Sequence, residues 1–286
     1  MRIAVTGANA GIGLRTVELL ASHGHEVVAF VRDPARGRDA IGSRTGVRLV
    51  QLDLSSSDSV RSAAEAVGDE PLDALINNAA VFDQTIRTVR RNAGGHELFW
   101  ATNHLGPFEL TARLSPALAR SAAPSVLFVA SKGLVVMPRI AIRFDALDGE
   151  GWFTPTRAYY HSKLAQIMTA MTLAERAGDR VDVTCIRVPA VRLDADRLAA
   201  QPAILRALYA PKNRAAAPPG VVAEAYERIV TRRRTARADD VYVDERLRVV
   251  PVPRSALDES SRRRLWASTM AATGKPAWAW DGLTEV

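Results

Sequence analysis

Short, nearly wholly apolar runs recur along the first two thirds of this chain, with segments of helical spacing between them. The apolar runs are Ile3–Val5, Val27–Val31, Val47–Leu52, Leu72–Ile76, Ser125–Ala130 and Val181–Val188. Runs of this length that are rich in β-branched residues predict strands buried on both faces of a sheet. We therefore expect a sheet of at least six strands with both faces covered.

The intervening segments predict the helices that cover this sheet. Helical spacing marks Gly13–Ser22, Ser55–Val67, His96–Arg120 and Thr156–Ala177. We expect Ser55 to be an N-cap, and Pro107 and Pro116 to kink or shorten the third helix. Strands that alternate with helices predict an α/β fold, a doubly wound (Rossmann-type) parallel sheet with helices on both faces. We predict a single domain over residues 1–286, with ligands bound beyond the carboxyl ends of the strands.

Composition indicates the environment of the protein. Of its 286 residues 48% are hydrophobic, enough for one large domain, and no apolar run approaches the ~18–20 residues that span a bilayer. The first predicted strand starts almost at Met1, so we expect no signal peptide and no membrane span. The single cysteine, Cys185, lies in an apolar run and predicts a buried thiol, in agreement with a cytoplasmic location.

The net charge of +7 comes mainly from arginine, and Arg232–Arg234 and Arg262–Arg264 form basic clusters. Such clusters can bind nucleic acid, but no aromatic residue interleaves with them, so we expect solvated surface and no nucleic-acid partner. His23 and His25 have no further histidine or cysteine neighbour at metal-ligand spacing. We therefore expect no metal site.

A glycine-rich turn follows the first strand. Gly7, Gly11 and Gly13 permit a tight turn, a close approach of the backbone to a pyrophosphate, and tight packing of helix on strand. The helix that begins near Gly11 presents free N–H groups to phosphates. The turn therefore predicts a dinucleotide site, with Asn9 and Ile12 as further contacts.

The end of the second strand bears on the choice between NAD and NADP. An acid such as Asp33 binds the ribose hydroxyls of NAD, whereas an arginine such as Arg32 accommodates the 2′-phosphate of NADP. Arg32 comes first after the strand, and a guanidinium can form two parallel hydrogen bonds with a phosphate, so we favour NADP(H) over NAD. The alternative is that Arg32 is a solvated residue at the end of the strand. Asp53, followed by Leu54, closes the third strand. We expect it to meet the adenine, although a strand-end aspartate also caps turns.

Tyr159 and Lys163 lie four residues apart on the last predicted helix and share a face. A free phenol has a pKa of ~10, and a nearby cation lowers that pKa toward the range useful for acid–base catalysis. Tyr160 is three residues from Lys163, and spacing alone does not exclude it. Ser131, just after the fifth strand, can hydrogen-bond a substrate oxygen at the sheet edge, and Asn103 lies in the preceding helix.

Eight segments along the chain carry a resemblance to one family. They are Thr6–Gly13, Asn77–Ala80, Thr102–Phe108, Val129–Ser131, Tyr159–Gln166, Val241–Val243, Leu257–Glu259 and Arg264–Trp266. Together they resemble the short-chain dehydrogenases/reductases, in the branch of the retinol dehydrogenases and their bacterial relatives. The resemblance implies that Tyr159, not Tyr160, gives a proton to a carbonyl oxygen. It also implies that Lys163 lowers the pKa of Tyr159 and binds the nicotinamide ribose, that Ser131 polarises the carbonyl, and that Asn103 supports a water-linked proton path.

The resemblance places further cofactor contacts at Asn78, Ala79 and Pro189. Three positions depart from the family's pattern. Ala80 replaces the last glycine of Asn-Asn-Ala-Gly, and Ala190 replaces the glycine after the proline. Leu193 or Asp194 stands where a threonine usually contacts the carboxamide, so the contacts to the nicotinamide are expected to differ here.

Residues 190–220 contain four prolines and few periodic signals, and we interpret them as a substrate-binding flap within the domain. Ile204, Leu205, Leu208 and Tyr209 have helical spacing and suit closure over an apolar ligand. Alternatively, these four residues pack in the core of the domain or form the interface of a homo-oligomer. Trp152 and Phe153 suit either a pocket wall or plain packing.

We predict an NADP(H)-dependent oxidoreductase that interconverts a ketone or aldehyde and an alcohol. Its substrate is expected to be a bulky, largely apolar small molecule, such as an intermediate of specialised metabolism. A non-redox dehydratase, cyclase or isomerase on the same fold is the first alternative, motivated by the altered Pro189–Asp194 segment. A nucleotide-binding sensor without turnover is the second; Ser131, Tyr159 and Lys163 argue against it, because a sensor does not need them.

Overall fold

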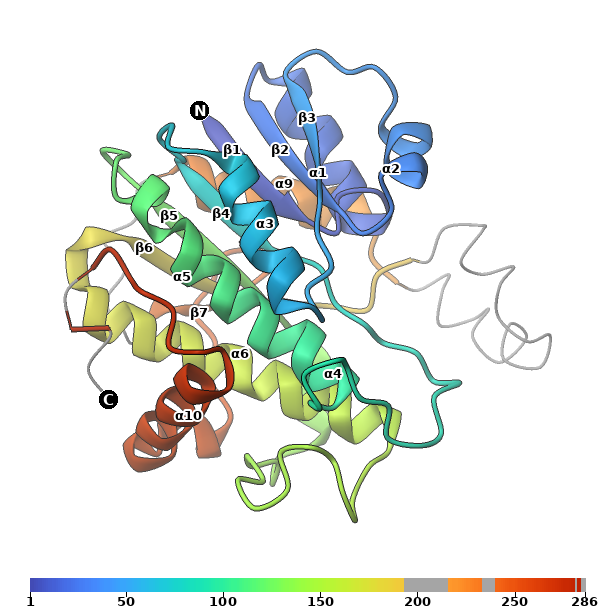
Figure 1. The fold of residues 1–286 in the computed structure, drawn as a ribbon, viewed down its shortest axis with the longest axis vertical. Helices are drawn as coiled ribbons and strands as arrows, with labels where there is room; N and C mark the ends of the chain where they lie inside the picture. The colour runs from blue at the N-terminus through green and yellow to red at the C-terminus, as the bar shows by residue number, and fades with distance from the viewer. Residues whose placement is uncertain (193–215, 233–239, 281, 284–286) are drawn as a thin grey trace.

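Seven parallel strands form one sheet in the order β3-β2-β1-β4-β5-β6-β7 (Figure 1). The computed structural model describes residues 1–192, 216–232, 240–280 and 282–283. The strands are β1 (Arg2–Thr6), β2 (Glu26–Val31), β3 (Val47–Gln51), β4 (Ala74–Asn77), β5 (Ser125–Ser131), β6 (Asp182–Val188) and β7 (Tyr242–Asp244). The six predicted strands match the first six within two residues at either end, and β7 adds an edge.

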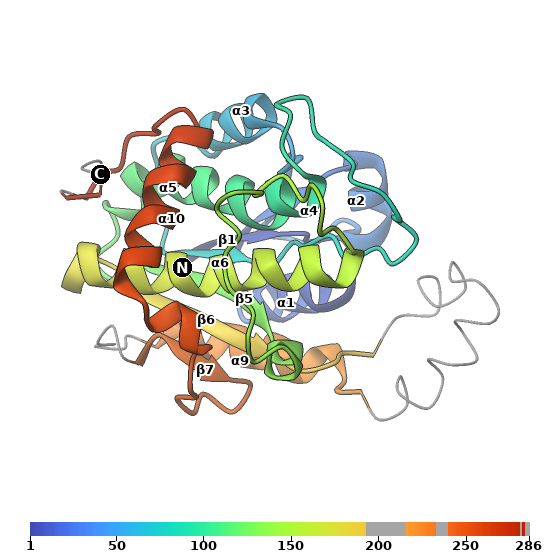
Figure 2. The same ribbon diagram turned by 90° about the horizontal axis from the view of Figure 1, so that it is seen from below.

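Helices cover both faces of this sheet, which confirms the doubly wound fold. One face carries α1 (Gly11–Ser22), α2 (Pro34–Ile41) and α9 (Pro219–Thr231). The other carries α3 (Ser57–Val67), α5 (Gly106–Leu118) and α6 (Pro155–Ala177), and α10 (Glu259–Ala272) packs outside α6 (Figure 2). None of the helices in the described parts of the chain combines the length and the apolar character that a bilayer crossing needs.

The strand order decides where a ligand can enter. Successive strands run outward from β1 to β3 on one side, and the chain then returns to place β4 on the other side of β1. The connections after β1 and β4 therefore leave the sheet toward opposite faces and open a crevice at the carboxyl edge. This crevice holds the candidate site described below.

The predicted helix His96–Arg120 is shorter and irregular. It consists of α4 (Leu98–Trp100), a π-helical turn over Ala101–Leu105, and α5. Pro107 lies in the first turn of α5 and has no N–H for the carbonyl four residues earlier, so the α-helical ladder is interrupted where the π turn ends. Pro116 is tolerated in the last turn of α5. The interruption lies at Asn103, and single π turns of this kind often occur at functional sites.

The expected N-cap of α3 is off by one residue. The helix begins at Ser57, and the Ser56 hydroxyl accepts the Ser59 N–H at 3.3 Å. Ser55 instead donates its own N–H and hydroxyl to Asp53, at 2.9 and 2.6 Å. The two serines are equivalent as caps in sequence, so the turn after β3 decides between them.

The C-terminal segment covers the outer face of α5 and α6 (Figure 2). The rings of Trp266 and Trp278 pack edge-on against Phe108 of α5, at centroid distances of 4.9 and 5.3 Å. Arg262, in the second predicted basic cluster, forms an ion pair with Glu175 of α6 at 2.7 Å. That cluster therefore helps to hold α10 in place and is not wholly solvated.

Candidate functional site

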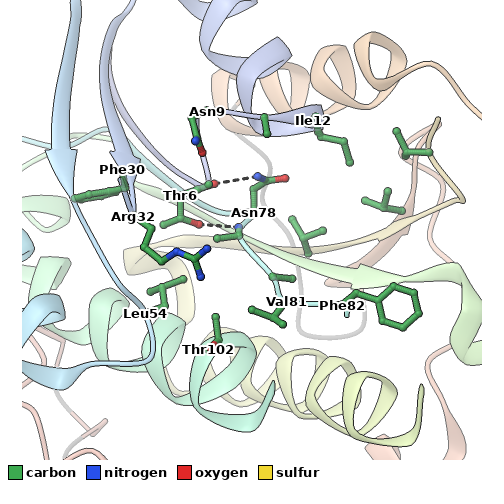
Figure 3. Close-up of a pocket in the computed structure, with 18 of the residues that line it drawn as sticks. Thr6, Asn9, Ile12, Phe30, Arg32, Leu54, Asn78, Val81, Phe82 and Thr102 are labelled. Carbon is green, nitrogen blue, oxygen red and sulfur yellow. Dashed lines mark hydrogen bonds between the residues drawn. The ribbon is translucent and has the colours of Figure 1, made fainter. Parts of the chain in front are cut away.

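A cavity of about 580 Å³ lies at the carboxyl edge of the sheet, between the loops that follow β1, β2, β4, β5 and β6 (Figure 3). All predicted site residues line it except Gly13 and Asn103. Those that do are Gly7, Asn9, Gly11, Ile12, Arg32, Asp53, Leu54, Asn78, Ala79, Ser131, Tyr159, Lys163 and Pro189. Arg36, Phe82, Thr102 and Arg192 also line the cavity, although the sequence does not predict them as site residues.

The glycine turn has the backbone geometry that its sequence predicts. Gly7 and Gly11 have φ values of +66° and +55°, which a residue with a Cβ rarely adopts. Gly13 does not reach the cavity, but a Cβ there would lie 2.1 Å from the carbonyl oxygen of Gly7. Its role is therefore to let α1 pack directly on the turn.

The N-terminus of α1 faces this turn, and no side chain in the described parts of the chain caps it. Ala10 is its N-cap, and no side chain caps the helix, nor is there an acid in its first turn. The first N–H groups of a helix have no intrahelical acceptor, and the helix dipole favours negative charge beside them. A phosphate is therefore a suitable occupant of this end of the cavity.

Thr6 and Asn78 join the two strands that flank the crevice. The Asn78 side-chain amide donates to the Thr6 carbonyl at 2.9 Å, and the Thr6 hydroxyl accepts the Ala79 N–H at 2.9 Å (Figure 3). The Tyr226 hydroxyl of α9 donates to the Asn78 side-chain oxygen at 3.3 Å. The Asn78 amide is thus committed to fixing the floor of the cavity.

At the end of β2 the structure separates the roles of Arg32 and Asp33. The Asp33 carboxylate caps α2 by accepting the N–H groups of Ala35 and Arg36, at 2.9 and 3.2 Å. Arg32 extends into the cavity, is exposed, and pairs with none of the described residues (Figure 3). Arg36 lines the same end but lies 3.6 Å from the Asp33 carboxylate. Of Arg32 and Arg36, only Arg32 is therefore without an ion pair among the described residues.

Asp53 lines the cavity, but its carboxylate is turned to the backbone. It accepts both hydrogen bonds from Ser55, and the Asp53 N–H lies 2.9 Å from the Ser59 hydroxyl. Of the two roles predicted for Asp53, adenine contact and capping of a turn, its carboxylate therefore has the second. A contact to adenine would use the backbone of this turn or the second carboxylate oxygen.

The predicted catalytic side chains converge at the other end of the cavity. The Ser131 and Tyr159 side chains line this end together, with Ser131 near enough to affect the pKa of Tyr159, and the Lys163 amine lies 5.7 Å from the centre of the Tyr159 ring. Lys163 donates to the Val129 carbonyl at 2.7 Å and to the Gln166 side chain at 2.9 Å. All of these groups come from β5 and α6, so the packing of this helix on this strand sets the geometry.

The pKa of Tyr159 shifts in the direction opposite to the expected one. Burial raises the pKa of Tyr159 to about 12, and the hydrogen bond with Ser131 only partly offsets this. Burial also lowers the pKa of Lys163 to about 7, so about half of this amine is protonated at neutral pH. The expected lowering of the Tyr159 pKa therefore does not occur in the protein alone, because burial disfavours the charged forms of both groups.

Asn103 holds two segments together instead of entering the cavity. Its side-chain oxygen accepts the Val81 N–H at 2.7 Å, and its amide donates to the Val81 carbonyl at 3.0 Å and to the Ser162 hydroxyl at 3.1 Å. Asn103 is fully buried and reaches these partners from the π turn. The water-linked proton path through Asn103 stays a prediction.

The neighbours of Tyr159 on α6 point elsewhere. The Tyr160 hydroxyl lies against Gly133, where a Cβ would come within 2.0 Å of it, and Tyr160 does not line the cavity. Trp152 donates to the Ala146 carbonyl at 2.8 Å, and Phe153 packs against Phe99. Trp152 and Phe153 are therefore packing residues.

Two buried histidines lie beside this site and should make stability depend on pH. Burial lowers the pKa of His104 to about 3 and that of His161 to about 4. The unfolded chain takes up these protons near pH 6.5, so unfolding binds protons and stability should fall as pH falls from 6.5 to about 4. Each histidine contributes a slope of at most ~1.4 kcal/mol per pH unit.

Urea unfolding across that pH range measures the slope. His161 accepts the Arg143 N–H at 3.0 Å, and a glutamine can accept the same hydrogen bond without titrating. His161→Gln should therefore reduce the slope by about half, since one of two similar titrations is removed. An unchanged slope would show that His161 is not the titrating group.

The predicted flap lies mostly outside the described residues, including Leu193, Asp194, Ile204, Leu205, Leu208 and Tyr209. Its two described ends pair with each other. Val191 and Ala217 form a parallel bridge, and the Arg192 N–H donates to the Ala217 carbonyl at 2.9 Å. The two described ends therefore meet close to Pro189, and Val191 and Arg192 line the cavity with it.

Known proteins resemble this chain in sequence. The profile of the short chain dehydrogenase family matches residues 1–142. Retinol dehydrogenase 12 of Homo sapiens is 34% identical over 219 residues, which cover 73% of this chain and 67% of the human protein. The chain belongs to the short-chain dehydrogenases/reductases. Retinol dehydrogenase 12 of Bos taurus is 36% identical over 182 residues, 61% of this chain, and that alignment spans only 56% of the bovine protein.

Solved structures of short-chain dehydrogenases/reductases and other proteins share the fold. A protein of Mycobacterium paratuberculosis superposes with a TM-score of 0.68 at 25% identity, over 96% of this chain and 93% of that one. A short chain dehydrogenase of Escherichia coli CFT073, complexed with NADPH, gives a TM-score of 0.64 at 22% identity, over 85% and 95% of the two chains. At 22% identity, the similarity to the Escherichia coli structure shows only that the two proteins share a fold.

Short-chain dehydrogenases/reductases use a nicotinamide dinucleotide, and the cavity fits one. The uncapped N-terminus of α1 suits the pyrophosphate, and Gly13 removes the Cβ that would push α1 off the turn. The unpaired Arg32 suits a further phosphate at the β2 end, about the place of an adenosine ribose. Tyr159, Ser131 and Lys163 then surround the end where the nicotinamide would lie.

Proposed function

We propose that this protein is an NADP(H)-dependent oxidoreductase that interconverts a ketone or aldehyde and an alcohol on a bulky, largely apolar small molecule. One observation carries the proposal. Ser131 and Tyr159, with Lys163 beside them, lie at one end of a cavity whose other end holds Arg32, an arginine that pairs with none of the described residues. This arrangement suits a proton donor and a phosphorylated dinucleotide in one site.

In this reaction the bound nicotinamide supplies or accepts the hydride. The chain supplies the proton chemistry. Tyr159 is protonated at neutral pH because burial raises its pKa to about 12, so it can give its proton to the carbonyl oxygen during reduction. The Ser131 hydroxyl is placed to hydrogen-bond the same oxygen, and the Lys163 amine, 5.7 Å from the centre of the phenol ring, is near enough to take part in the return of the proton.

The apolar character of the substrate is supported by the walls at the reactive end. Val81, Phe82, Val129 and Val188 line the cavity there, and Arg32, Asp33 and Arg36 line it after β2. The name of retinol dehydrogenase 12, to which the chain is similar, also points to a lipophilic alcohol. A panel of aryl, alkyl and hydroxylated ketones with NADPH tests the proposal. Turnover confined to small polar sugars or hydroxy acids would contradict the substrate class.

Arg32→Ala tests the preference for NADPH. An unpaired guanidinium gains charge-assisted hydrogen bonds only with the 2′-phosphate, so the Kd of NADPH should rise about 10- to 100-fold and that of NADH should change little. Arg36→Ala is the matched control and should have a smaller effect, because Asp33 already holds Arg36. Titration by fluorescence measures both constants. Equal effects of Arg32→Ala on both dinucleotides would show that Arg32 does not face the phosphate.

A further inference from the structure

Phe82 exposes an aromatic ring at the reactive end of the cavity. Phe82 lies two residues after the Asn-Asn-Ala-Ala segment that follows β4, and 48% of the residue is exposed although it is large and apolar. Its ring centroid lies 4.4 Å from that of Tyr159, with the two planes tilted by 45°. Figure 3 shows Phe82 on the opposite side of the cavity from Phe30 and Arg32. The ring therefore covers one side of the phenol and leaves its other surface to the cavity.

The position of this ring is fixed through its neighbour in the chain. Both backbone polar groups of Val81 are bound by the Asn103 amide, which also donates to Ser162 of α6. The Ser162 hydroxyl in turn donates to the Tyr159 carbonyl at 2.7 Å. One chain of hydrogen bonds therefore joins the backbone on which Phe82 lies to the helix turn that carries Tyr159.

A small apolar cluster supports the same arrangement. Ile86, Phe99 and Ala158 are buried together, and Val81, Phe153 and Tyr159 pack against them as a group separate from the two large cores. Phe82 lies at the cavity side of this group, whereas Phe153 packs against Phe99 at a centroid distance of 6.0 Å and does not line the cavity. Two phenylalanines near Tyr159 thus differ in one respect: only Phe82 faces the space that a substrate would fill.

We propose that Phe82 is a specificity-determining residue that favours carbonyl compounds with an aromatic or conjugated group next to the carbonyl carbon. The inference rests on the proposed function, since it assumes that the carbonyl oxygen meets Tyr159 and Ser131. With the oxygen held there, a substituent on the carbonyl carbon lies beside the phenol, where the exposed Phe82 ring is its neighbour. Aromatic rings attract one another beyond the effect of buried area, in offset or edge-on contacts at centroid distances of ~4.5–7 Å.

Two ketones of nearly equal size separate this effect from simple hydrophobicity. Acetophenone carries a phenyl ring and cyclohexyl methyl ketone carries a saturated one. The measured quantity is the ratio of their kcat/KM values with NADPH, in the wild type, in Phe82→Leu and in the control Phe153→Leu. Leucine keeps an apolar side chain at position 82 but removes the ring.

We expect Phe82→Leu to shift the ratio about 2- to 10-fold toward the cyclohexyl ketone, most of it through KM, and Phe153→Leu to leave the ratio as in the wild type. Equal ratios in the wild type and Phe82→Leu would overturn the inference while leaving the proposed function intact. Equal shifts in both variants would also overturn it, because the effect would then come from the cluster as a whole. Turnover of neither ketone, nor of any carbonyl compound in the wider panel, would overturn the proposed function and this inference with it.

Discussion

Replacing Tyr159 with phenylalanine is expected to lower kcat/KM for ketone reduction by about 10²- to 10⁴-fold, the usual contribution of a positioned proton donor. The hydroxyl is the group that lies near Ser131 and would protonate the substrate oxygen. The ring itself stays in place, because Phe82 and the small cluster around Phe99 contact it and not the hydroxyl. The Kd of NADPH should therefore change little. Initial rates and a fluorescence titration of the same preparation measure both.

Tyr160→Phe is the matched control. Its hydroxyl lies against Gly133 and outside the cavity, so we expect the rate of this variant to stay within a few-fold of the wild type. Spacing along the helix does not distinguish the two tyrosines, since both can reach Lys163. A large loss in Tyr160→Phe together with a small loss in Tyr159→Phe would reverse the assignment.

Gly13→Ala is expected to have the second largest effect, on stability and on cofactor binding together. The added Cβ would lie 2.1 Å from the carbonyl oxygen of Gly7, and neither partner can move without shifting the turn or the helix. Overpacking of this kind lowers the free energy of unfolding by ~1–3 kcal/mol. The Kd of NADPH should rise at least ~10-fold, because the turn and the first N–H groups of α1 form one site.

Gly220→Ala supplies the control for Gly13→Ala. Gly220 is also helical, in the first turn of α9, and a Cβ there meets nothing within 4 Å. Alanine is a better helix former than glycine by ~0.5–1 kcal/mol, so Gly220→Ala should leave stability unchanged or raise it slightly. Urea unfolding of the two variants compares them directly. A Gly13→Ala protein as stable as Gly220→Ala would show that the turn is looser than the structure indicates.

The strands and their order of appearance could be predicted because each is a separate apolar run bounded by turn residues. The helix between β4 and β5 could not be described fully, because a π turn depends on how Pro107 and the buried Asn103 are accommodated together. The sequence shows that a proline lies in the helix, but it does not show how the helix rearranges around the carbonyl that the proline cannot hydrogen-bond. Ser56 took the cap expected of Ser55 for a similar reason, since the turn geometry after β3 decides.

The cavity lining was largely predictable, because parallel strands bring their carboxyl ends to one edge. The roles of particular side chains were less so. Asp33 is followed by Pro34, the signature of an N-cap and first helical residue, and this signal could have assigned the Asp33 carboxylate to α2 and left Arg32 to the cavity. Asn103 and Phe82 required the structure. The hydrogen bonds of the Asn103 amide to Val81 join segments 22 residues apart, and no spacing rule places the adjacent ring on Tyr159.

The pKa of Tyr159 could not be predicted from the sequence, because it depends on how deeply the side chain is buried. The four-residue spacing of Tyr159 and Lys163 gives no information on that burial. A tyrosine protonated at neutral pH favours carbonyl reduction, and the reverse reaction needs the phenolate. Alcohol oxidation should therefore accelerate as pH rises toward about 12, the pKa that burial gives Tyr159 in the protein alone. Oxidation rates of a secondary alcohol between neutral and alkaline pH measure this. A rate independent of pH would argue against Tyr159 as the proton acceptor.

The central claim is that the cavity carries out redox chemistry with the proton supplied by Tyr159. Reduction of acetophenone with NADPH deuterated at the transferred position of the nicotinamide tests it most directly, with the product alcohol analysed by mass spectrometry. We predict one deuterium on the carbinol carbon for each NADPH consumed, and loss of this product in Tyr159→Phe. Conversion of the ketone without the dinucleotide, or an alcohol without deuterium, would contradict the claim.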